Sequence, residues 1–334
     1  MVINFNYPKK TIDYISGHIF KGKNYRCSYI RFRTLYNNFS PGTENVELYL
    51  YEPKKKTRAS TIILHGLGSR NIKFILKLGP LLANAGVCSG ILILPGNYTR
   101  VEKNSVSGRS YLFPNIDIMF KFWEHGVVDT LATIDLMEQL GLWKENNMIL
   151  GYCLGGMVAT IVGAMDSRIN HLLFMTTGGH LPQIFHQSPV TRFARRLFEN
   201  GLKTDYYLEG KEKLYKIYDE QFPKVKEMSF EEITKADIHP LFKVDPISYA
   251  HLLDKKKVTF IDAYFDRTLP VEARKILYEE MEGANRKILP ISHVSWLPFG
   301  YFLAKYMLYK LNINEKEIKK ALLTREVIEN PLEK

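Results

Sequence analysis

The chain has 334 residues, of which 46% are hydrophobic and 24% charged, and its formal net charge is +11. This is the composition of a globular protein with a large core, and it excludes a disordered or repetitive chain. Residues 1–60 hold eleven Lys or Arg against four acidic residues, and so contribute +7 of the net charge. Because no nucleic-acid motif accompanies this charge, we expect a solvated basic face and no nucleic-acid partner.

Several further absences limit the classes of protein to consider. The three cysteines lack the spacing of a disulfide framework, and residues 1–11 contain no apolar stretch of signal-peptide length, so a cytoplasmic location is expected. No Cys/His cluster has zinc-site spacing and no glycine-rich loop fits a phosphate motif, so neither a metal nor a cofactor is expected. The apolar segment 294–311 is interrupted by Pro298 and Lys305, which argues against stable membrane insertion. The oligomeric state stays open.

Apolar runs and helical patterns alternate along most of the chain. Two antiparallel strands are predicted first, and from residue 60 onward short buried strands alternate with amphipathic helices, as expected for a parallel sheet covered on both faces. We therefore predict an α/β protein with a mostly parallel, eight-stranded sheet flanked by helices. The predicted strands cover residues 25–33, 45–51, 60–64, 90–94, 148–150, 171–175, 257–263 and 286–289, and the predicted helices include 71–86, 116–141, 271–283 and 294–311.

The alternation stops between residues 176 and 254, where the sequence is polar, aromatic and mostly helical in pattern. We interpret this stretch as a helical cap or lid inserted over the strand ends. The predicted domains are a first core segment 1–178, a cap 179–254, a second core segment 255–313 and a charged helical tail 314–334. Six aromatic residues of the cap would either wall an acyl pocket or only hold the cap together: Phe185, Phe193, Phe198, Tyr206, Tyr207 and Tyr215.

A strand, a tight turn and a helix meet at residues 148–159, with Cys153 at the tip of the turn. Gly151 and Gly155 flank Cys153 in the spacing of a nucleophile elbow, G-x-S-x-G, with sulfur in place of oxygen. Glycine lacks the Cβ atom that would clash where strand and helix meet at a sharp angle. Cys153 is therefore a candidate nucleophile, the alternative being a small buried thiol at a strand end.

An acid and a histidine follow in the order that such an elbow requires. Asp266 lies in a loop just after the strand 257–263, and His293 follows the next strand. Since carboxyl ends of parallel strands share one sheet edge, both are expected to meet Cys153 there. Taken singly, each would more simply be a polar residue at a helix start. Asp262 competes as the acid, but it lies inside the strand run.

A further strand, residues 60–64, runs into His65-Gly66-Leu67. Either this is an ordinary turn between strand and helix, or it forms an oxyanion loop. In the second case the backbone N–H groups of Leu67 and Leu154 would point at the substrate oxygen.

With these motifs the chain resembles the α/β-hydrolase superfamily from about residue 60 to residue 311. The string Gly151-Tyr152-Cys153-Leu154-Gly155-Gly156 is similar to the cysteine elbow of dienelactone hydrolases, and also to the cysteine box of polyhydroxyalkanoate synthases. The order Cys153, Asp266, His293 matches both. Two features depart from the pattern: dienelactone hydrolases have no large cap, and their substrate-binding arginines have no counterpart that we can place here.

The resemblance implies an enzyme, a hydrolase of carboxylic esters, lactones or thioesters acting on a small acyl substrate through a Cys-His-Asp triad and a thioacyl intermediate. Two alternatives stay open: an acyltransferase of the polyhydroxyalkanoate-synthase type, and a non-catalytic binding protein with this fold.

Overall fold

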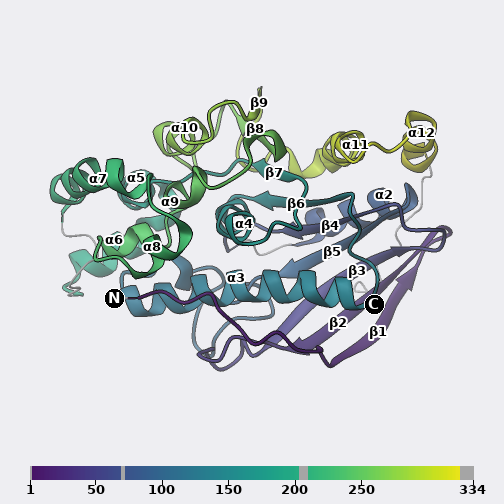
Figure 1. Ribbon diagram of the computed structural model, residues 1–334, viewed down its shortest axis with the longest axis horizontal. Coiled ribbons are helices and arrows are strands. Elements are labelled where there is room, and N and C mark those ends of the chain that lie inside the picture. The colour runs from purple at the N-terminus through teal and green to yellow at the C-terminus, as the bar shows by residue number, and fades with distance from the viewer. Residues whose placement is uncertain (1, 69–71, 203–209, 324–334) are drawn as a thin grey trace.

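One large sheet runs through the molecule. The computed structural model describes residues 2–68, 72–202 and 210–323. In these ranges the sheet has nine strands in the order β1-β2-β3-β5-β4-β6-β7-β8-β9 (Figure 1). Strands β4 to β9 pair in parallel, whereas β1, β2 and β3 join through antiparallel pairing that ends on β5. The strands are β1 (Tyr14–Lys21), β2 (Tyr25–Arg33), β3 (Asn45–Pro53), β4 (Ala59–Leu64), β5 (Val87–Ile93), β6 (Asn147–Tyr152), β7 (Leu172–Met175), β8 (Val258–Ala263) and β9 (Asn285–Leu289).

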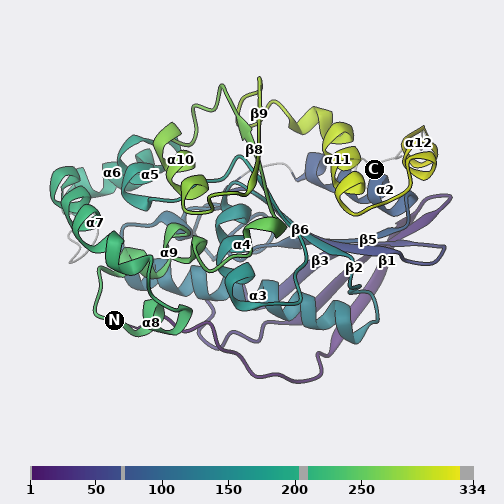
Figure 2. The same cartoon turned by 45° about the horizontal axis from the view of Figure 1, so that its top comes forward.

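Helices cover both faces of the central strands. Every residue of β4, β5 and β6 is buried, which is why these strands read as continuous apolar runs. Figures 1 and 2 show α3 and α4 on one face and α2, α11 and α12 on the other. The helices are α1 (Lys73–Leu76), α2 (Leu78–Asn84), α3 (Ile116–Gln139), α4 (Leu154–Met165), α5 (Leu181–Gln187), α6 (Arg192–Glu199), α7 (Lys211–Val225), α8 (Phe230–Lys235), α9 (Ile247–Ala250), α10 (Val271–Glu279), α11 (Gly300–Lys310) and α12 (Glu315–Leu323).

The predicted mostly parallel sheet is confirmed, but its strand number is nine and not eight. The strand that the sequence pattern missed is β1, which pairs with β2 at the edge of the sheet. None of its eight residues is buried. An edge strand without a buried face has no alternation of apolar and polar residues, so the pattern gives no sign of it.

The predicted helices 116–141 and 271–283 end earlier, at Gln139 and Glu279, and the other two differ more. The segment 294–311 begins as a turn and a short 3₁₀ helix, Leu297–Phe299, and becomes α-helical only at Gly300. Pro298 explains the delay, since its ring and missing N–H fit the first turn of a helix better than its interior. The segment 71–86 contains two short helices, α1 and α2, that meet at Lys77.

The stretch between β7 and β8 carries α5 to α9. Asp245 ties this stretch together: its buried carboxylate accepts hydrogen bonds from the N–H of His180 at 2.8 Å, from the N–H of Leu181 at 2.6 Å and from the Tyr218 hydroxyl at 3.0 Å. Through these hydrogen bonds the carboxylate fixes the segment after β7 against α7. Loss of one of its partners would lower the stability of the fold, because a buried charge would be left without that hydrogen bond. That residues 179–254 act as a separate cap remains a prediction.

Candidate active site

Cys153 occupies the sharp turn between β6 and α4. Its φ of 53° and ψ of −114° are unusual for a residue with a side chain, so the backbone is strained there. A Cβ atom on Gly151 would come within 2.5 Å of the Gly156 Cα, and one on Gly155 within 2.2 Å of the Leu64 oxygen. Both positions thus accept only glycine while the turn keeps this shape. Cys153 itself is 7% exposed.

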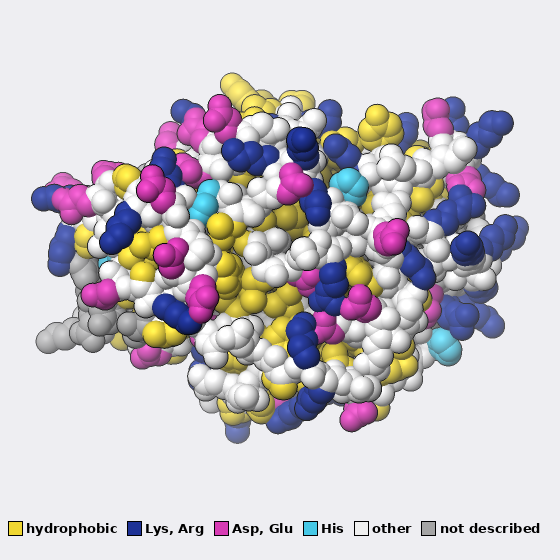
Figure 3. Space-filling model, in the orientation of Figure 1, with side chains coloured by type: hydrophobic (Ala, Val, Ile, Leu, Met, Phe, Trp, Pro, Cys, Tyr) yellow, Lys and Arg dark blue, Asp and Glu magenta, His cyan; other side chains and the backbone are white. Residues whose placement is uncertain are grey.

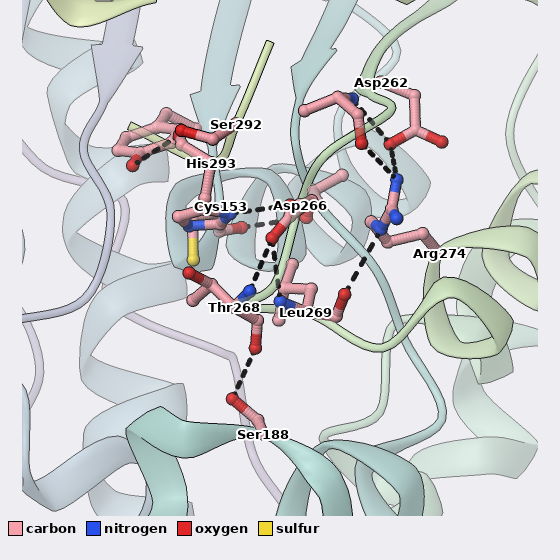
Figure 4. A network of polar contacts seen from close by, with 12 residues as sticks. Cys153, Ser188, Asp262, Asp266, Thr268, Leu269, Arg274, Ser292 and His293 are labelled. Carbon is pink, nitrogen blue, oxygen red and sulfur yellow. Dashed lines mark hydrogen bonds and ion pairs between the residues drawn. The ribbon is translucent and has the colours of Figure 1, made fainter. Parts of the chain in front are cut away.

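Asp266 and His293 lie on the loops that follow β8 and β9. The Nδ1 atom of His293 and an Asp266 carboxylate oxygen are 2.8 Å apart. The other carboxylate oxygen accepts from the N–H groups of Thr268 at 2.7 Å and Leu269 at 3.0 Å. Figure 4 shows Cys153, Asp266 and His293 side by side. The structure therefore brings together the three residues that the sequence places at one edge of the sheet.

The charges of these groups depend on one another. Burial opposes a positive charge on His293, but the Cys153 thiol and the Asp266 carboxylate beside it raise the pKa of His293 to about 10. Burial alone would raise the pKa of Asp266, but His293 and the two N–H donors lower it below its usual value. The arrangement favours a charged imidazole beside the Asp266 carboxylate.

Two aromatic side chains fix the backbone of His293. Its carbonyl oxygen accepts from the Tyr152 hydroxyl at 3.1 Å and from the Trp296 indole N–H at 3.0 Å. The Tyr152 ring also lies 5.3 Å from the imidazole ring, measured between centroids. Because Tyr152 directly precedes Cys153, the strand that carries the thiol also positions the histidine loop.

The loop after β4 packs closely on the elbow. The N–H of Gly155 donates to the His65 carbonyl at 3.0 Å, and a Cβ atom on Gly66 would lie 3.2 Å from the Cys153 Cβ. This contact places Leu67 next to the elbow. Leu154 is the first residue of α4, where a backbone N–H has no acceptor within the helix. Their assignment to an oxyanion hole remains a prediction.

The His65 side chain has a structural role. It is fully buried; its Nδ1 lies 2.8 Å from the Gly66 oxygen, and its Nε2 accepts from the Leu94 N–H at 3.0 Å. This pattern requires the neutral ring with its proton on Nδ1. Burial accordingly lowers the pKa of His65 to about 4. The ring thus holds the loop after β4 against the end of β5.

Asn97 is a positioning residue that the sequence pattern did not reveal. Its fully buried side chain accepts from the Gly68 N–H at 3.0 Å and donates to the Pro95 carbonyl at 3.1 Å. Gly108 lies so close that a Cβ atom on it would stand 2.4 Å from the Gly68 nitrogen. The loop after β5 therefore holds the loop that carries Leu67. The only signal in the sequence was the Pro95-Gly96 pair after a buried strand.

Asp262, the competing acid, is engaged elsewhere. It lies within β8 and pairs with Arg274 on α10 (Figure 4). It also pairs with Arg286 on β9, at 2.6 Å. Its charge is balanced by these two guanidinium groups. Among the hydrogen bonds of the described residues, Asp262 makes none to His293.

The six aromatic residues of the predicted cap have different surroundings. Phe185 is fully buried, Phe198 is exposed, and the Phe193 ring lies 5.2 Å from the Arg109 guanidinium. The Tyr215 hydroxyl accepts from Gln187 at 3.1 Å. Tyr206 and Tyr207 lie outside the described residues. An acyl pocket walled by these side chains remains a prediction.

The other two cysteines, Cys27 and Cys88, are fully buried. Burial raises the pKa of Cys27 to about 12 and also raises that of Cys88 above its ordinary value. Both are therefore inert, packed thiols. Within residues 2–68, 72–202 and 210–323, no cluster of three or more His, Cys, Asp or Glu is arranged to hold a metal ion, and no helix is long and apolar enough to cross a bilayer.

No protein-family model and no curated protein sequence matches this chain. Solved structures do. The acetyl xylan esterase from Paenibacillus sp. R4 superimposes with a TM-score of 0.63 over 90% of this chain and 89% of its own, at 13% sequence identity. Acetyl xylan esterase 1 from Thermoanaerobacterium sp. JW/SL YS485 gives a TM-score of 0.55 over 90% and 89%, at 15% identity.

The acylaminoacyl peptidase of Pyrococcus horikoshii gives a TM-score of 0.58 at 11% identity, and covers 90% of this chain but 44% of its own. At such low identities the similarity concerns the fold. The chain has the α/β-hydrolase fold, as the resemblance in the sequence implied.

Proposed function

We propose that this protein hydrolyses carboxylic esters, lactones or thioesters, with Cys153 as nucleophile, His293 as general base and acid, and Asp266 as the group that orients His293. The observation that carries the proposal is the 2.8 Å contact between His293 and Asp266, with the thiol at the strained turn beside them. The names of the structural neighbours, esterases and a peptidase, support an acyl substrate. The likeness of the elbow to dienelactone hydrolases supports a thiol nucleophile.

In the free enzyme the raised pKa of His293 favours an imidazolium beside a thiolate. The sulfur attacks the substrate carbonyl carbon, and the N–H groups of Leu67 and Leu154 receive the developing oxyanion. As the intermediate collapses, the bond from carbon to the leaving oxygen or sulfur breaks, and His293 donates its proton to the leaving group. A thioester on Cys153 remains.

Acylation removes the negative charge of the sulfur, which is a principal cause of the raised pKa of His293. His293 has already given its proton to the leaving group, and without the charge on the sulfur it stays neutral and can accept a proton from water. Attack of this water on the thioester releases the acid and restores the thiolate and imidazolium. Loss of the sulfur charge on acylation thus prepares His293 to act as the base in the second step.

The test is intact-protein mass spectrometry after mixing with p-nitrophenyl esters of short and medium chain length. We expect a transient acyl adduct on Cys153 together with nitrophenol release in the unmodified protein. His293→Ala should abolish the release, and Cys153→Ser should lose the thioester adduct. Two variants serve as matched controls: Cys88→Ala, which changes a packed thiol, and His171→Ala, which changes the histidine just before the amino end of β7.

Turnover that persists in Cys153→Ala would overturn the proposal. A stable adduct that is released only when a hydroxyl or thiol acceptor is added would instead identify an acyltransferase.

A further inference from the structure

One end of the sheet lacks the cover that the rest of it has. All residues of β8 are buried, whereas four of the five residues of β9 are exposed. Strands of a parallel sheet are normally covered on both faces. Here α10 lies on one side of β8 and β9 (Figure 2), whereas α11, on the other side, packs mainly against α2 and α12.

An apolar cavity of about 520 Å³ lies between α11 and these strands. Its walls come from β7, β8 and β9, from the segment that leads into α11 and from α11 itself, and include Met175, Ile261, Leu289, Trp296, Phe302 and Tyr306. Lys287 is the one charged residue in its lining. Cavities of this size accommodate small organic molecules or part of an aliphatic chain.

Large apolar side chains are exposed around the cavity mouth, with 59% of Phe299 and 67% of Phe302 accessible to solvent. Leu289 and Val294 are exposed beside them. Figure 3 shows hydrophobic side chains gathered at the top of the molecule, above β9. We call these four residues, together with the lysines described next, the β9–α11 surface. Exposed apolar groups that gather in this way mark an interaction site.

The charged residues of this surface are all positive. Residues 283–314 contain no Asp or Glu but hold four cations, Arg286, Lys287, Lys305 and Lys310. Arg286 is paired with Asp262, whereas the ammonium groups of Lys287 and Lys310 lie 5.6 and 6.0 Å from the ring centre of Tyr306. The acidic side chains of α10 belong to the helix on the other side of β8 and β9 (Figure 1).

We propose that the β9–α11 surface docks on an anionic lipid bilayer. Exposed aromatic and aliphatic side chains beside lysines and without acidic residues are the combination that binds the interface of a negatively charged membrane. A second copy of the chain is the weaker candidate, because a two-fold contact through this surface would face its cations with the same cations.

Docking here would place the membrane beside the candidate active site. Trp296 lines the cavity and also donates a hydrogen bond to the carbonyl of His293. An acyl chain that leaves the bilayer for the cavity would therefore lie against the loop that carries His293. The inference does not require Cys153 to be a nucleophile, since docking depends on the surface alone.

The test is flotation of the full-length protein with vesicles of phosphatidylcholine, alone or mixed with phosphatidylglycerol in equal amounts. We expect the protein to float with the mixed vesicles and to remain unbound with pure phosphatidylcholine. Lys305→Glu should weaken partitioning by about fivefold or more, and Phe302→Ser by about tenfold. High salt should release the protein. Cys153→Ser should float like the unmodified protein, which separates this test from that of the proposed function.

Matched controls come from the opposite edge of the sheet. Ile15→Ser and Lys21→Glu make the same kinds of change on β1, where both side chains are exposed, and should leave flotation unchanged. Failure to float with the anionic vesicles would overturn the proposal, as would equal loss in the β1 controls. Sedimentation that shows a dimer, which Phe302→Ser dissociates, would assign the surface to a second copy instead.

Discussion

Two carboxylates four residues apart, Asp262 and Asp266, have opposite surroundings. Asp262 lies inside its strand between two guanidinium groups, whereas Asp266 lies beyond the strand and faces an imidazole and two backbone N–H groups. A carboxylate already neutralised by arginines is a structural link between β8, β9 and α10. One that is paired with a histidine can influence how that histidine handles a proton. The difference is made by position relative to the strand end.

Removal of the charge of Asp266 should have the largest effect on activity. Asp266→Asn keeps the shape of the side chain but no longer stabilises a positive His293, so we expect kcat/KM for p-nitrophenyl acetate to fall by roughly 10³-fold. The free energy of unfolding should change by less than about 1 kcal/mol. Unchanged turnover would show that Asp266 does not assist His293.

Asp262→Asn should have the reverse effect. Loss of the charge leaves Arg274 buried without its anionic partner, and the free energy of unfolding should fall by about 3 kcal/mol. Urea unfolding followed by circular dichroism measures this change. The kcat of the molecules that remain folded should stay within about twofold of that of the unmodified protein. A stable Asp262→Asn variant without activity would transfer the role of acid to Asp262.

The pH dependence of thiol alkylation tests the pair that Asp266 supports. His293→Ala removes the imidazolium, so alkylation of Cys153 by iodoacetamide at neutral pH should slow by about tenfold. His293, with its pKa raised to about 10, loses its charge as the pH rises past that value. The rates of the two proteins should therefore converge in strongly alkaline solution. Equal rates at neutral pH would contradict the ion pair.

The smallest effect on activity is expected for Asn97, whose side chain acts only by positioning the backbone of a loop. Asn97→Ala removes the acceptor of the Gly68 N–H, and the loop that carries Leu67 should lose its fixed position. We expect kcat to fall by about fivefold with KM less affected, because the oxyanion is stabilised mainly in the transition state. Asn97→Asp, which retains the acceptor oxygen, should recover part of the loss. A change in KM alone would argue for a different role.

The sequence predicted the parts of this molecule that depend on local pattern. Each of these parts depends on residues that are close together in the sequence. They are the buried strands of β-branched and aliphatic residues, the glycines around Cys153 and the strand-end positions of Asp266 and His293. The edge strand β1 could not, since neither of its faces is buried.

Contacts between distant segments also escaped prediction. Three such contacts join residues that only the folded chain brings together. They are the ion pairs of Asp262, the hydrogen bond from Gly68 to Asn97 and the hydrogen bond from Tyr152 to the His293 carbonyl. His65 shows the same limit, because its ring could be assigned to the structure only when both of its nitrogens were seen to have partners.

The burial of Cys27 and Cys88 makes the unmodified protein suitable for counting functional molecules. With two thiols packed in the core, a mild alkylating reagent should add one label per folded chain, at Cys153. The fraction of molecules labelled then serves as an active-site titration, and no engineered background free of other cysteines is required. Every rate measured on variants of Asp262, Asp266, Asn97 or His293 can thereby be expressed per molecule with a competent thiol.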